Sequence, residues 1–431
     1  MLDIKLLREQ PDVVRQGLAK RNPKLSLDEI LVMEKERRTM VAGIDNDRAQ
    51  LNRGSEEFGK QQAQAKGKLT PPPELRQLSD SIKEREQQLK QLEERISITL
   101  SYLPNIPHAS VPVGDASHNE IVRTVGEKPS YGFALKTHVD LGERLGLFDL
   151  ARAAKITGSH FPLYRGDGAR LERALIAWML DVHTREHGYT EISPPFLVNR
   201  ASMFGTGQLP KFEEDLYRLK DDDLFLIPTA EVPVTNLHRD ETLDEEQLPI
   251  CYTAYTPCFR REAGSYGKET KGLVRIHQFD KVELVQFVAP EKSYEAHEQL
   301  VRQAETILQR LGLHYRVLCL ASGDIGFSAA KCYDLEAWAP GLNQYLEVSS
   351  CSNFEDFQAR RANIRYRQQS TKKPAFVHTL NGSGLALART VICLLETYQQ
   401  ADGRVVVPEV LRPYLNGQEV LDGSSSARAV R

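Results

Sequence analysis

The sequence FRREAGSYGKETKGLVRIHQFDKVE, residues Phe259–Glu283, predicts two strands joined by a polar loop that contains glycine. Arg260 and Glu262 are two residues apart, so on a strand their side chains point to the same face. The returning strand carries charged and aromatic side chains in one phase, namely Arg275, His277, Phe279 and Glu283. Because charged side chains are almost never buried without partners, this sheet face is predicted to hold a charged ligand.

The residue types of this face suggest what the ligand contains. An arginine presents a planar fork of donors that suits phosphate or carboxylate. A glutamate can accept a hydrogen bond from an ammonium group, a hydroxyl or an adenine amino group. Phe279 offers a flat apolar surface for a ring.

Length and composition limit the class of protein. The 431 residues predict two or three domains, and 41% hydrophobic with 27% charged residues is ordinary for a globular chain. No run of about 18 apolar residues occurs, so no membrane span is expected. The N-terminal residues include acids and fit neither a signal nor a transit peptide. The six cysteines lack CxxC spacing, which favours reduced thiols in the cytoplasm and predicts no structural zinc.

The N-terminal part has helical periodicity. Ser26 and Glu29 have the spacing of a capping box, which predicts that a helix opens there. Positions 30–58 and 75–103 each follow a 3-4 alternation of mostly apolar residues, and the sequence GKLTPPP at 67–73 separates them. Two such seams joined by a proline turn predict an antiparallel coiled-coil hairpin over about residues 29–101.

The hairpin alone leaves two functions open. It could serve dimerisation or spacing, or it could reach out and grip a distant part of a large ligand. Basic residues that could touch phosphates are interleaved with acids, namely Arg37, Arg38, Arg48, Arg53, Lys60, Lys66 and Lys68. Such a charge pattern by itself is typical of a solvated helix face.

The remaining chain is predicted to be α+β. Residues 1–110 form the N-terminal domain, 111–136 a linker, and 137–415 an antiparallel sheet with flanking helices. The strand–helix alternation of a doubly wound nucleotide fold is missing from the pattern. The polar segment 416–431, with three consecutive serines, is predicted to be disordered.

Three further motifs are weak when taken singly. Gly382–Gly384 is predicted to open a helix, and Arg389 in that helix needs an anionic partner, either a phosphate or a structural carboxylate. Glu347 and Ser350 could hold Mg²⁺ between phosphates or could form cross-strand hydrogen bonds.

Taken together, these segments resemble one family. GYTEISPP at 188–195, FRREAGSYGKETKGLVRIHQF at 259–279 and NGSGLALAR at 381–389 resemble motifs 1, 2 and 3 of the class II aminoacyl-tRNA synthetases. Four other segments and the helical hairpin are similar to seryl-tRNA synthetases in particular. These segments are GTGQLP at 205–210, TAE at 229–231, GFSAAKCYDLEAW at 326–338 and EVSSCSNFEDFQARR at 347–361.

The resemblance implies two sets of site residues. ATP would be bound by Arg260, Glu262, Arg275, Phe279, Glu347, Val348, Ser349, Ser350 and Arg389. Serine would be bound by Thr229, Ala230, Glu231, Arg260, Glu283, Asn381 and Ser383.

Individual roles follow from the same resemblance. Arg260 and Arg389 would be catalytic, the first on the α-phosphate and the serine carboxylate, the second on the γ-phosphate. Glu262 would contact the adenine amino group and Phe279 would stack on the ring. Glu347 and Ser350 would hold Mg²⁺.

The resemblance also implies the reaction and the partners. The enzyme would activate L-serine with ATP and transfer the seryl group to tRNA(Ser), and also to tRNA(Sec) if that tRNA is accepted. The hairpin would grip the tRNA, and the enzyme would be a cytoplasmic homodimer formed through the segment around Gly188–Pro195. Two alternatives stay open, a paralogue that loads a carrier protein and a non-catalytic relative.

Overall fold

The computed structural model describes residues 1–65, 70–263 and 271–424. The chain divides into two units, Leu2–Pro104 and Asn105–Arg431, with Met1 counted in the second. Within the described ranges, no helix is long and apolar enough to cross a membrane.

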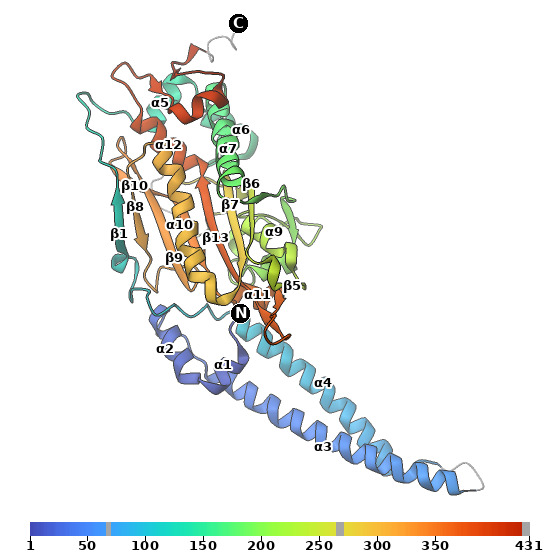
Figure 1. Ribbon diagram of the computed structural model, residues 1–431. Coiled ribbons are helices and arrows are strands. Elements are labelled where there is room, and N and C mark those ends of the chain that lie inside the picture. The colour runs from blue at the N-terminus through green and yellow to red at the C-terminus, as the bar shows by residue number, and fades with distance from the viewer. Residues whose placement is uncertain (66–69, 264–270, 425–431) are drawn as a thin grey trace. The chain divides into compact units, whose positions relative to one another are not determined.

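The first unit consists of four helices, α1 (Ile4–Glu9), α2 (Pro11–Arg21), α3 (Asp28–Gln64) and α4 (Pro73–Ser101). The last two pack side by side as the predicted hairpin (Figure 1). With 37 residues, α3 is about 55 Å long at 1.5 Å per residue. The loop predicted at 67–73 lies partly outside the described residues.

The hairpin seam mixes apolar contacts with ion pairs. Its buried side chains are Ile30, Met33, Ile44, Ile82, Leu92, Ile96 and Leu100. At polar positions of the seam, ion pairs connect the two helices. Arg85 Nη1, for example, lies 2.7 Å from Asp47 Oδ2. Gly54 has no side chain where Leu75 packs, and a Cβ there would fall 2.5 Å from Leu75 Cδ2.

The predicted capping box is wrong. Helix α3 begins at Asp28 with Leu27 as its N-cap residue, so Ser26 lies one residue too early. The Ser26 hydroxyl instead accepts a hydrogen bond from the Asp28 backbone N–H at 3.1 Å, forming a local turn ahead of the helix.

The second unit is built on an eight-stranded sheet, which confirms the predicted α+β class. The strand order is β1 (Glu120–Val125), β8 (Tyr315–Cys319), β9 (Lys331–Ala339), β10 (Gln344–Asn353), β13 (His378–Ala386), β7 (Gln278–Val288), β6 (Ile250–Phe259) and β2 (Thr190–Glu191). All neighbours are antiparallel except β2 and β6, which are parallel.

Several helices of this unit pack against the sheet, and the smaller strands form one three-stranded sheet and two strand pairs (Figure 1). The helices are α5 (His138–Leu145), α6 (Leu150–Thr157), α7 (Asp167–Arg185), α8 (Arg200–Gly205), α9 (Glu231–Thr235), α10 (Ser293–Arg310), α11 (Phe357–Ala362) and α12 (Leu387–Thr397). The smaller strands are β3 (Leu197–Asn199), β4 (Leu224–Leu226), β5 (Thr242–Asp244), β11 (Arg365–Arg367), β12 (Pro374–Phe376), β14 (Val405–Val406) and β15 (Val420–Leu421).

The two faces of the central strands have different environments. On one face α10 packs closely, because Gly382 leaves room for Leu300 and the buried His297 Nε2 lies 2.8 Å from the Cys351 carbonyl oxygen. Cys351 and Gly382 are directly paired, so they share this face. Their neighbours in sequence, including Ser350 and Ser383, therefore point to the opposite face. That opposite face is the floor of the cleft described below.

Two expectations about chain organisation are wrong. The segment 111–136, predicted to be a linker, contains strand β1, which pairs with β8. It carries no apolar alternation because Ile121 and Val122 are both exposed on this edge strand. Gly382–Gly384 lies in strand β13 and does not open a helix, since α12 begins at Leu387.

The start of the predicted disordered tail is also structured. Strand β15 pairs with β14 and buries Leu421. Arg170 Nη1 donates to Gln418 Oε1 at 2.8 Å. One buried leucine and one half-buried glutamine are too few to show in a polar composition. The rest of the tail, 425–431, lies outside the described residues.

Candidate active site

A cleft of about 680 Å³ opens on the face of the central strands opposite α10. It brings together most of the residues that the sequence singled out. They are Thr229, Glu231, Arg260, Glu262, Arg275, Phe279, Glu283, Glu347, Val348, Ser350, Asn381, Ser383 and Arg389.

Two predicted residues do not line this cleft. Ala230 is fully buried and packs in an apolar cluster with Val234 and Phe287. The Ser349 hydroxyl donates to the Ser383 carbonyl oxygen at 2.7 Å and is buried in the sheet. Each sits between two residues that do line the cleft, so its side chain points the other way.

The strand phase predicted for the first residues of the cleft is wrong, although their proximity is right. The β6–β7 ladder ends at the pair Phe259 and Gln278, so Arg260 and Glu262 follow β6 and Arg275 precedes β7. Glu262 has a left-handed backbone with φ of 51°, and its carboxylate forms an ion pair with Arg275. A turn therefore achieves the juxtaposition that was attributed to strand alternation.

Arginine side chains give one part of the cleft a positive charge. The Arg260 guanidinium lies 5.2 Å from the centre of the Phe279 ring, and its Nε donates to the Pro228 carbonyl oxygen at 3.2 Å. A guanidinium has five N–H donors, and this bond uses one of them. Arg389 Nε donates to the Val274 carbonyl oxygen at 3.3 Å, and its Nη1 lies 3.5 Å from Glu347 Oε2. Both guanidinium groups are thus held in place by backbone carbonyls.

Oxygen ligands lie next to these arginines. Glu347 is exposed, and Ser350 Oγ lies 3.1 Å from Cys332 Sγ. Ser350 pairs across the strands with Asp334, and burial together with the nearby Glu347 carboxylate raises the pKa of Asp334. Within the described ranges, no group of three or more His, Cys, Asp or Glu could hold a metal by itself. One or two carboxylates and a hydroxyl fit Mg²⁺, which takes its remaining ligands from water and substrate phosphates.

The other part of the cleft is acidic and buried. Glu283 is 1% exposed and accepts from the Asn381 amide at 3.1 Å and from the Thr229 hydroxyl at 3.0 Å. Glu231 accepts from the Gln358 amide at 2.6 Å. Burial, with the neighbouring Glu283 as a second cause, raises the pKa of Glu231 to about 7.

One residue of this acidic part, Lys281, was not predicted from the sequence. Lys281 forms an ion pair with Glu283, and its ammonium donates to Thr229 Oγ1 at 2.9 Å. It lines the cleft and is 6% exposed. The alternation of Phe279 and Glu283 along β7 includes position 281, so the strand phase alone could have identified it.

Comparisons with known proteins place this arrangement in a class. The family model described as tRNA synthetase class II core domain (G, H, P, S and T) matches residues 211–398. A second model, Seryl-tRNA synthetase N-terminal domain, matches residues 1–107. The antiparallel sheet with its arginine-bearing cleft is therefore the catalytic core of a class II aminoacyl-tRNA synthetase.

Relatives define the family within that class. The serine–tRNA ligase of Carboxydothermus hydrogenoformans is 55% identical over 416 residues, which cover 96% of this chain and 98% of the relative. That of Geobacillus kaustophilus is 54% identical over 98% of this chain and 100% of the relative. The chain belongs to the seryl-tRNA synthetase family, the enzymes that activate L-serine with ATP and transfer the seryl group to tRNA(Ser).

Solved structures agree with this membership. Seryl-tRNA synthetase from Pyrococcus horikoshii, complexed with ATP, has a TM-score of 0.90 and 41% identity, covering 98% of this chain and 99% of that one. Cytoplasmic serine–tRNA ligase from Naegleria fowleri, in complex with AMP, has a TM-score of 0.86 and 32% identity, covering 98% of both chains. Neither a carrier-loading paralogue nor a non-catalytic relative gains support from these comparisons.

Proposed function

We propose that the cleft forms seryl-adenylate by binding serine at its acidic part and ATP at its arginine-lined part. The observation that carries this proposal is the combination of two buried carboxylates, Glu231 and Glu283, with two guanidinium groups, Arg260 and Arg389, in one cavity. Serine carries an ammonium and ATP carries a triphosphate, so each end of the cavity has the charge opposite to its ligand.

The serine end selects the substrate by its hydrogen bonds. Glu231 and Glu283 accept from the ammonium and the hydroxyl, together with Thr229, Asn381 and Ser383 around them. Alanine and glycine lack the hydroxyl and would leave buried polar groups unpaired, which a site of this kind rejects strongly. Threonine is refused by fit around its extra methyl, which is worth only about 1–3 kcal/mol.

The ATP end holds the base and the phosphates. Phe279 stacks on the adenine, and Glu262 accepts from its amino group while remaining close to Arg275. Val348 lines the same part of the cleft, and Arg389 binds the γ-phosphate.

Mg²⁺ would be held by Glu347 and Ser350, with Asp334 next to them on the adjacent strand. Bound there, the ion would neutralise phosphate charge.

The chemistry is an attack by the serine carboxylate on the α-phosphate, with pyrophosphate leaving in line. Two anions must approach each other, so the site works by positioning and charge neutralisation. Arg260 contacts both the carboxylate and the α-phosphate and lowers their mutual repulsion. No general base is required, because the attacking carboxylate is already ionised. His277 Nδ1 contacts the Arg260 carbonyl oxygen at 2.9 Å and has a structural role.

The arm of α3 and α4 is proposed to grip tRNA(Ser). Of the basic residues considered for this role, Arg37 and Arg48 form ion pairs across the hairpin with Glu93 and Glu86. Arg53 and Lys60, further along α3, are exposed. Lys66 and Lys68 lie outside the described residues. Acceptance of tRNA(Sec) is tested by charging both tRNAs side by side.

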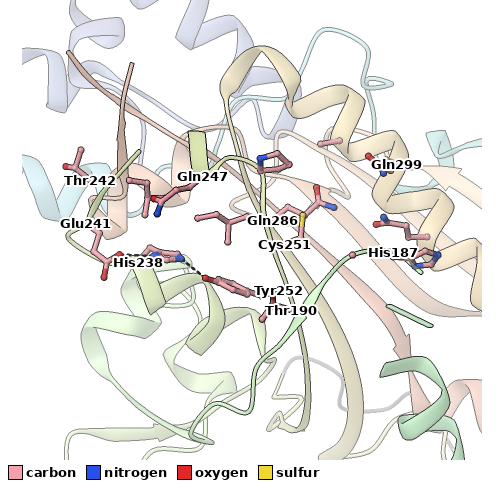
Figure 2. A pocket seen from close by; sticks show the side chains of 16 residues that line it. His187, Thr190, His238, Glu241, Thr242, Gln247, Cys251, Tyr252, Gln286 and Gln299 are labelled. Carbon is pink, nitrogen blue, oxygen red and sulfur yellow. Dashed lines mark hydrogen bonds and ion pairs between the residues drawn. The ribbon is translucent and has the colours of Figure 1, made fainter. Parts of the chain in front are cut away.

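A second copy of the chain is proposed to dock on a groove beside strand β2. The groove has a volume of about 920 Å³, and Gly188, Thr190, Tyr252 and Gln286 line it (Figure 2). Strand β2 ends the sheet and its two residues are exposed, so a partner can cover it without displacing any element. A monomer in analytical ultracentrifugation at micromolar concentration would overturn this.

Cytoplasmic localisation is also part of the proposal. It is supported by the six cysteines, all of which are unpaired in the described chain.

The proposal is tested by ATP–pyrophosphate exchange with each of the twenty amino acids, followed by charging of tRNA(Ser). Exchange with serine and none of the others is the expected result. Folded protein that shows no exchange with serine would overturn the proposal.

A further inference from the structure

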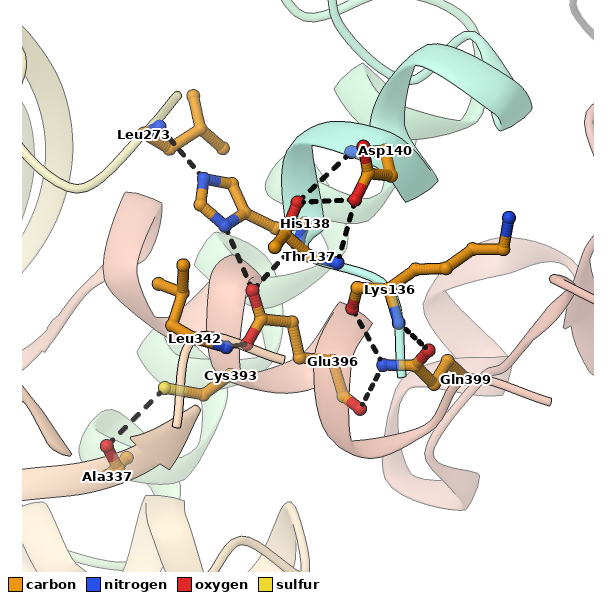
Figure 3. A network of polar contacts seen from close by, with 10 residues as sticks. All are labelled: Lys136, Thr137, His138, Asp140, Leu273, Ala337, Leu342, Cys393, Glu396 and Gln399. Carbon is orange, nitrogen blue, oxygen red and sulfur yellow. Dashed lines mark hydrogen bonds and ion pairs between the residues drawn. The ribbon is translucent and has the colours of Figure 1, made fainter. Parts of the chain in front are cut away.

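A buried polar network centres on Glu396 and contains no residue assigned to a substrate (Figure 3). Glu396 of α12 has a fully buried carboxylate. Its Oε2 accepts from the Leu342 backbone N–H at 3.0 Å, and its Oε1 accepts from the His138 backbone N–H at 2.8 Å. A buried carboxylate is costly unless it is hydrogen-bonded, so these contacts hold Glu396 in place.

The imidazole of His138 connects this carboxylate to the loop of motif 2. The Leu273 backbone N–H lies 3.2 Å from His138 Nε2, and since an N–H can only donate, Nε2 must be the acceptor. The proton of the neutral ring is then on Nδ1, which donates to Glu396 Oε1 at 3.0 Å. The two nitrogens therefore have different partners and different roles.

The segment that His138 contacts leads from the motif 2 loop back to strand β7. The β6–β7 ladder ends at the pair Phe259 and Gln278, and one further backbone bond follows it, from the Arg260 N–H to the His277 carbonyl oxygen at 2.9 Å, so residues 271–276 lie beyond the paired strands. Gly272 lies against the imidazole with φ of 71°, and a Cβ there would fall 2.3 Å from His138 Nε2. The backbone thus passes close beside Nε2 of the ring, at a position that only glycine occupies without strain.

This short segment carries two groups of the arginine-lined part of the cleft. The Val274 carbonyl oxygen accepts from Arg389 Nε, and Arg275 pairs with Glu262. A displacement of Leu273 would also move Val274 and Arg275, the two residues that follow it in the chain. The acidic residues Glu231 and Glu283 lie on α9 and β7, outside this segment.

We infer that His138, oriented by Glu396, is a positioning residue. It fixes residues 271–276, which lead from the motif 2 loop back to β7, and thereby the ATP end of the cleft. The inference rests on the proposed function, because it concerns the ATP half of that site. His138 touches no substrate in this scheme. Its effect passes through Leu273 to Arg275 and Arg389.

Two substitutions separate the contacts of the ring. In His138→Asn the side-chain amide can still donate to Glu396, but nothing reaches Leu273. In His138→Gln the longer side chain can place its oxygen near the Leu273 N–H. We expect His138→Asn to lower kcat/KM for ATP in serine-dependent exchange by about 10- to 100-fold, the range for a small misplacement of reacting groups. KM for serine should stay within about twofold, and His138→Gln should recover most of the loss.

A second pair of variants tests the same contact from the loop. Gly272→Ala introduces a methyl against the imidazole, whereas Gly417→Ala imposes similar backbone strain at φ of 76° with no atom within 4 Å. Gly272→Ala should lower kcat/KM for ATP, and Gly417→Ala should leave it unchanged. This pair carries the test if His138→Asn fails to fold, as judged by circular dichroism.

The outcomes also separate this inference from the proposed function. Equal losses for ATP and serine, or unchanged kinetics in both His138→Asn and Gly272→Ala, would overturn the positioning role while the enzyme remains active. Absence of exchange in the unsubstituted enzyme would instead overturn the proposed function. ATP binding by calorimetry, which needs no turnover, would then still compare the variants.

Discussion

Serine binding should depend on pH through Glu231. This carboxyl group is buried beside Glu283, and burial first and that neighbour second raise its pKa to about 7. If Glu231 accepts from the serine ammonium, only its ionised form binds well. As the pH falls through 7 the group becomes protonated in the free enzyme, so KM for serine should rise.

The magnitude follows from the shifted value. With a pKa of about 7, roughly one tenth of the enzyme has ionised Glu231 at pH 6, and each pH unit is worth about 1.36 kcal/mol. We therefore expect KM for serine to be about tenfold higher at pH 6 than at pH 8. The same raised pKa makes the ligand-free enzyme lose stability as the pH rises from 4.5, the ordinary value, through about 7.

The assay is pyrophosphate exchange at saturating ATP, with serine titrated between pH 6 and pH 8. Glu231→Gln is the test variant, because its amide cannot ionise, and it should have a high KM that does not change with pH. KM for ATP in the same buffers is the control and should stay flat, since Glu231 lies at the serine end. A wild-type KM for serine that is constant with pH, or a pH dependence that persists in Glu231→Gln, would contradict this role of Glu231.

Three other changes have expected outcomes. Arg260→Ala removes an electrostatic clamp and should slow exchange about 10²- to 10³-fold, whereas a near-normal rate would remove Arg260 from the site. Deletion of residues 29–101 should leave serine-dependent exchange intact and abolish tRNA charging, and retained charging would contradict the role of the arm. Glu172→Gln removes a buried carboxyl whose pKa burial and Asp280 raise to about 9. Because that raised pKa costs the folded state stability from about pH 4.5 to 9, the variant should gain stability over wild type as pH rises, by up to about 1.4 kcal/mol per pH unit in urea titrations. If the stabilities of Glu172→Gln and wild type changed in parallel with pH, the raised pKa of Glu172 beside Asp280 would be contradicted.

The pattern of residues along the chain was sufficient to predict features that depend on neighbours in sequence. The 3-4 alternation predicted both helices of the arm, because a helix repeats every 3.6 residues and its buried stripe shows in sequence. The segments that resemble the class II motifs predicted which residues meet in the cleft. The types of those residues indicated an anion-binding part and an ammonium-binding part.

Features that depend on partners far along the chain could not be read this way. Strand β1 has no apolar alternation, because it is an edge strand defined by its pairing with β8. The side chain of Ser349 points away from the cleft because of the register of β10.

The kind of chemistry could be predicted from the residue types, since charge and hydrogen-bonding capacity belong to the residues. Which distant side chains meet in the cleft, and what orients them, depends on how the chain folds. Thr229 meets Glu283 across 54 positions of chain, and His138 meets Leu273 across 135 positions. Hydrogen bonds and strand pairing between distant segments leave no periodic trace in the sequence, and they set the geometry of this site.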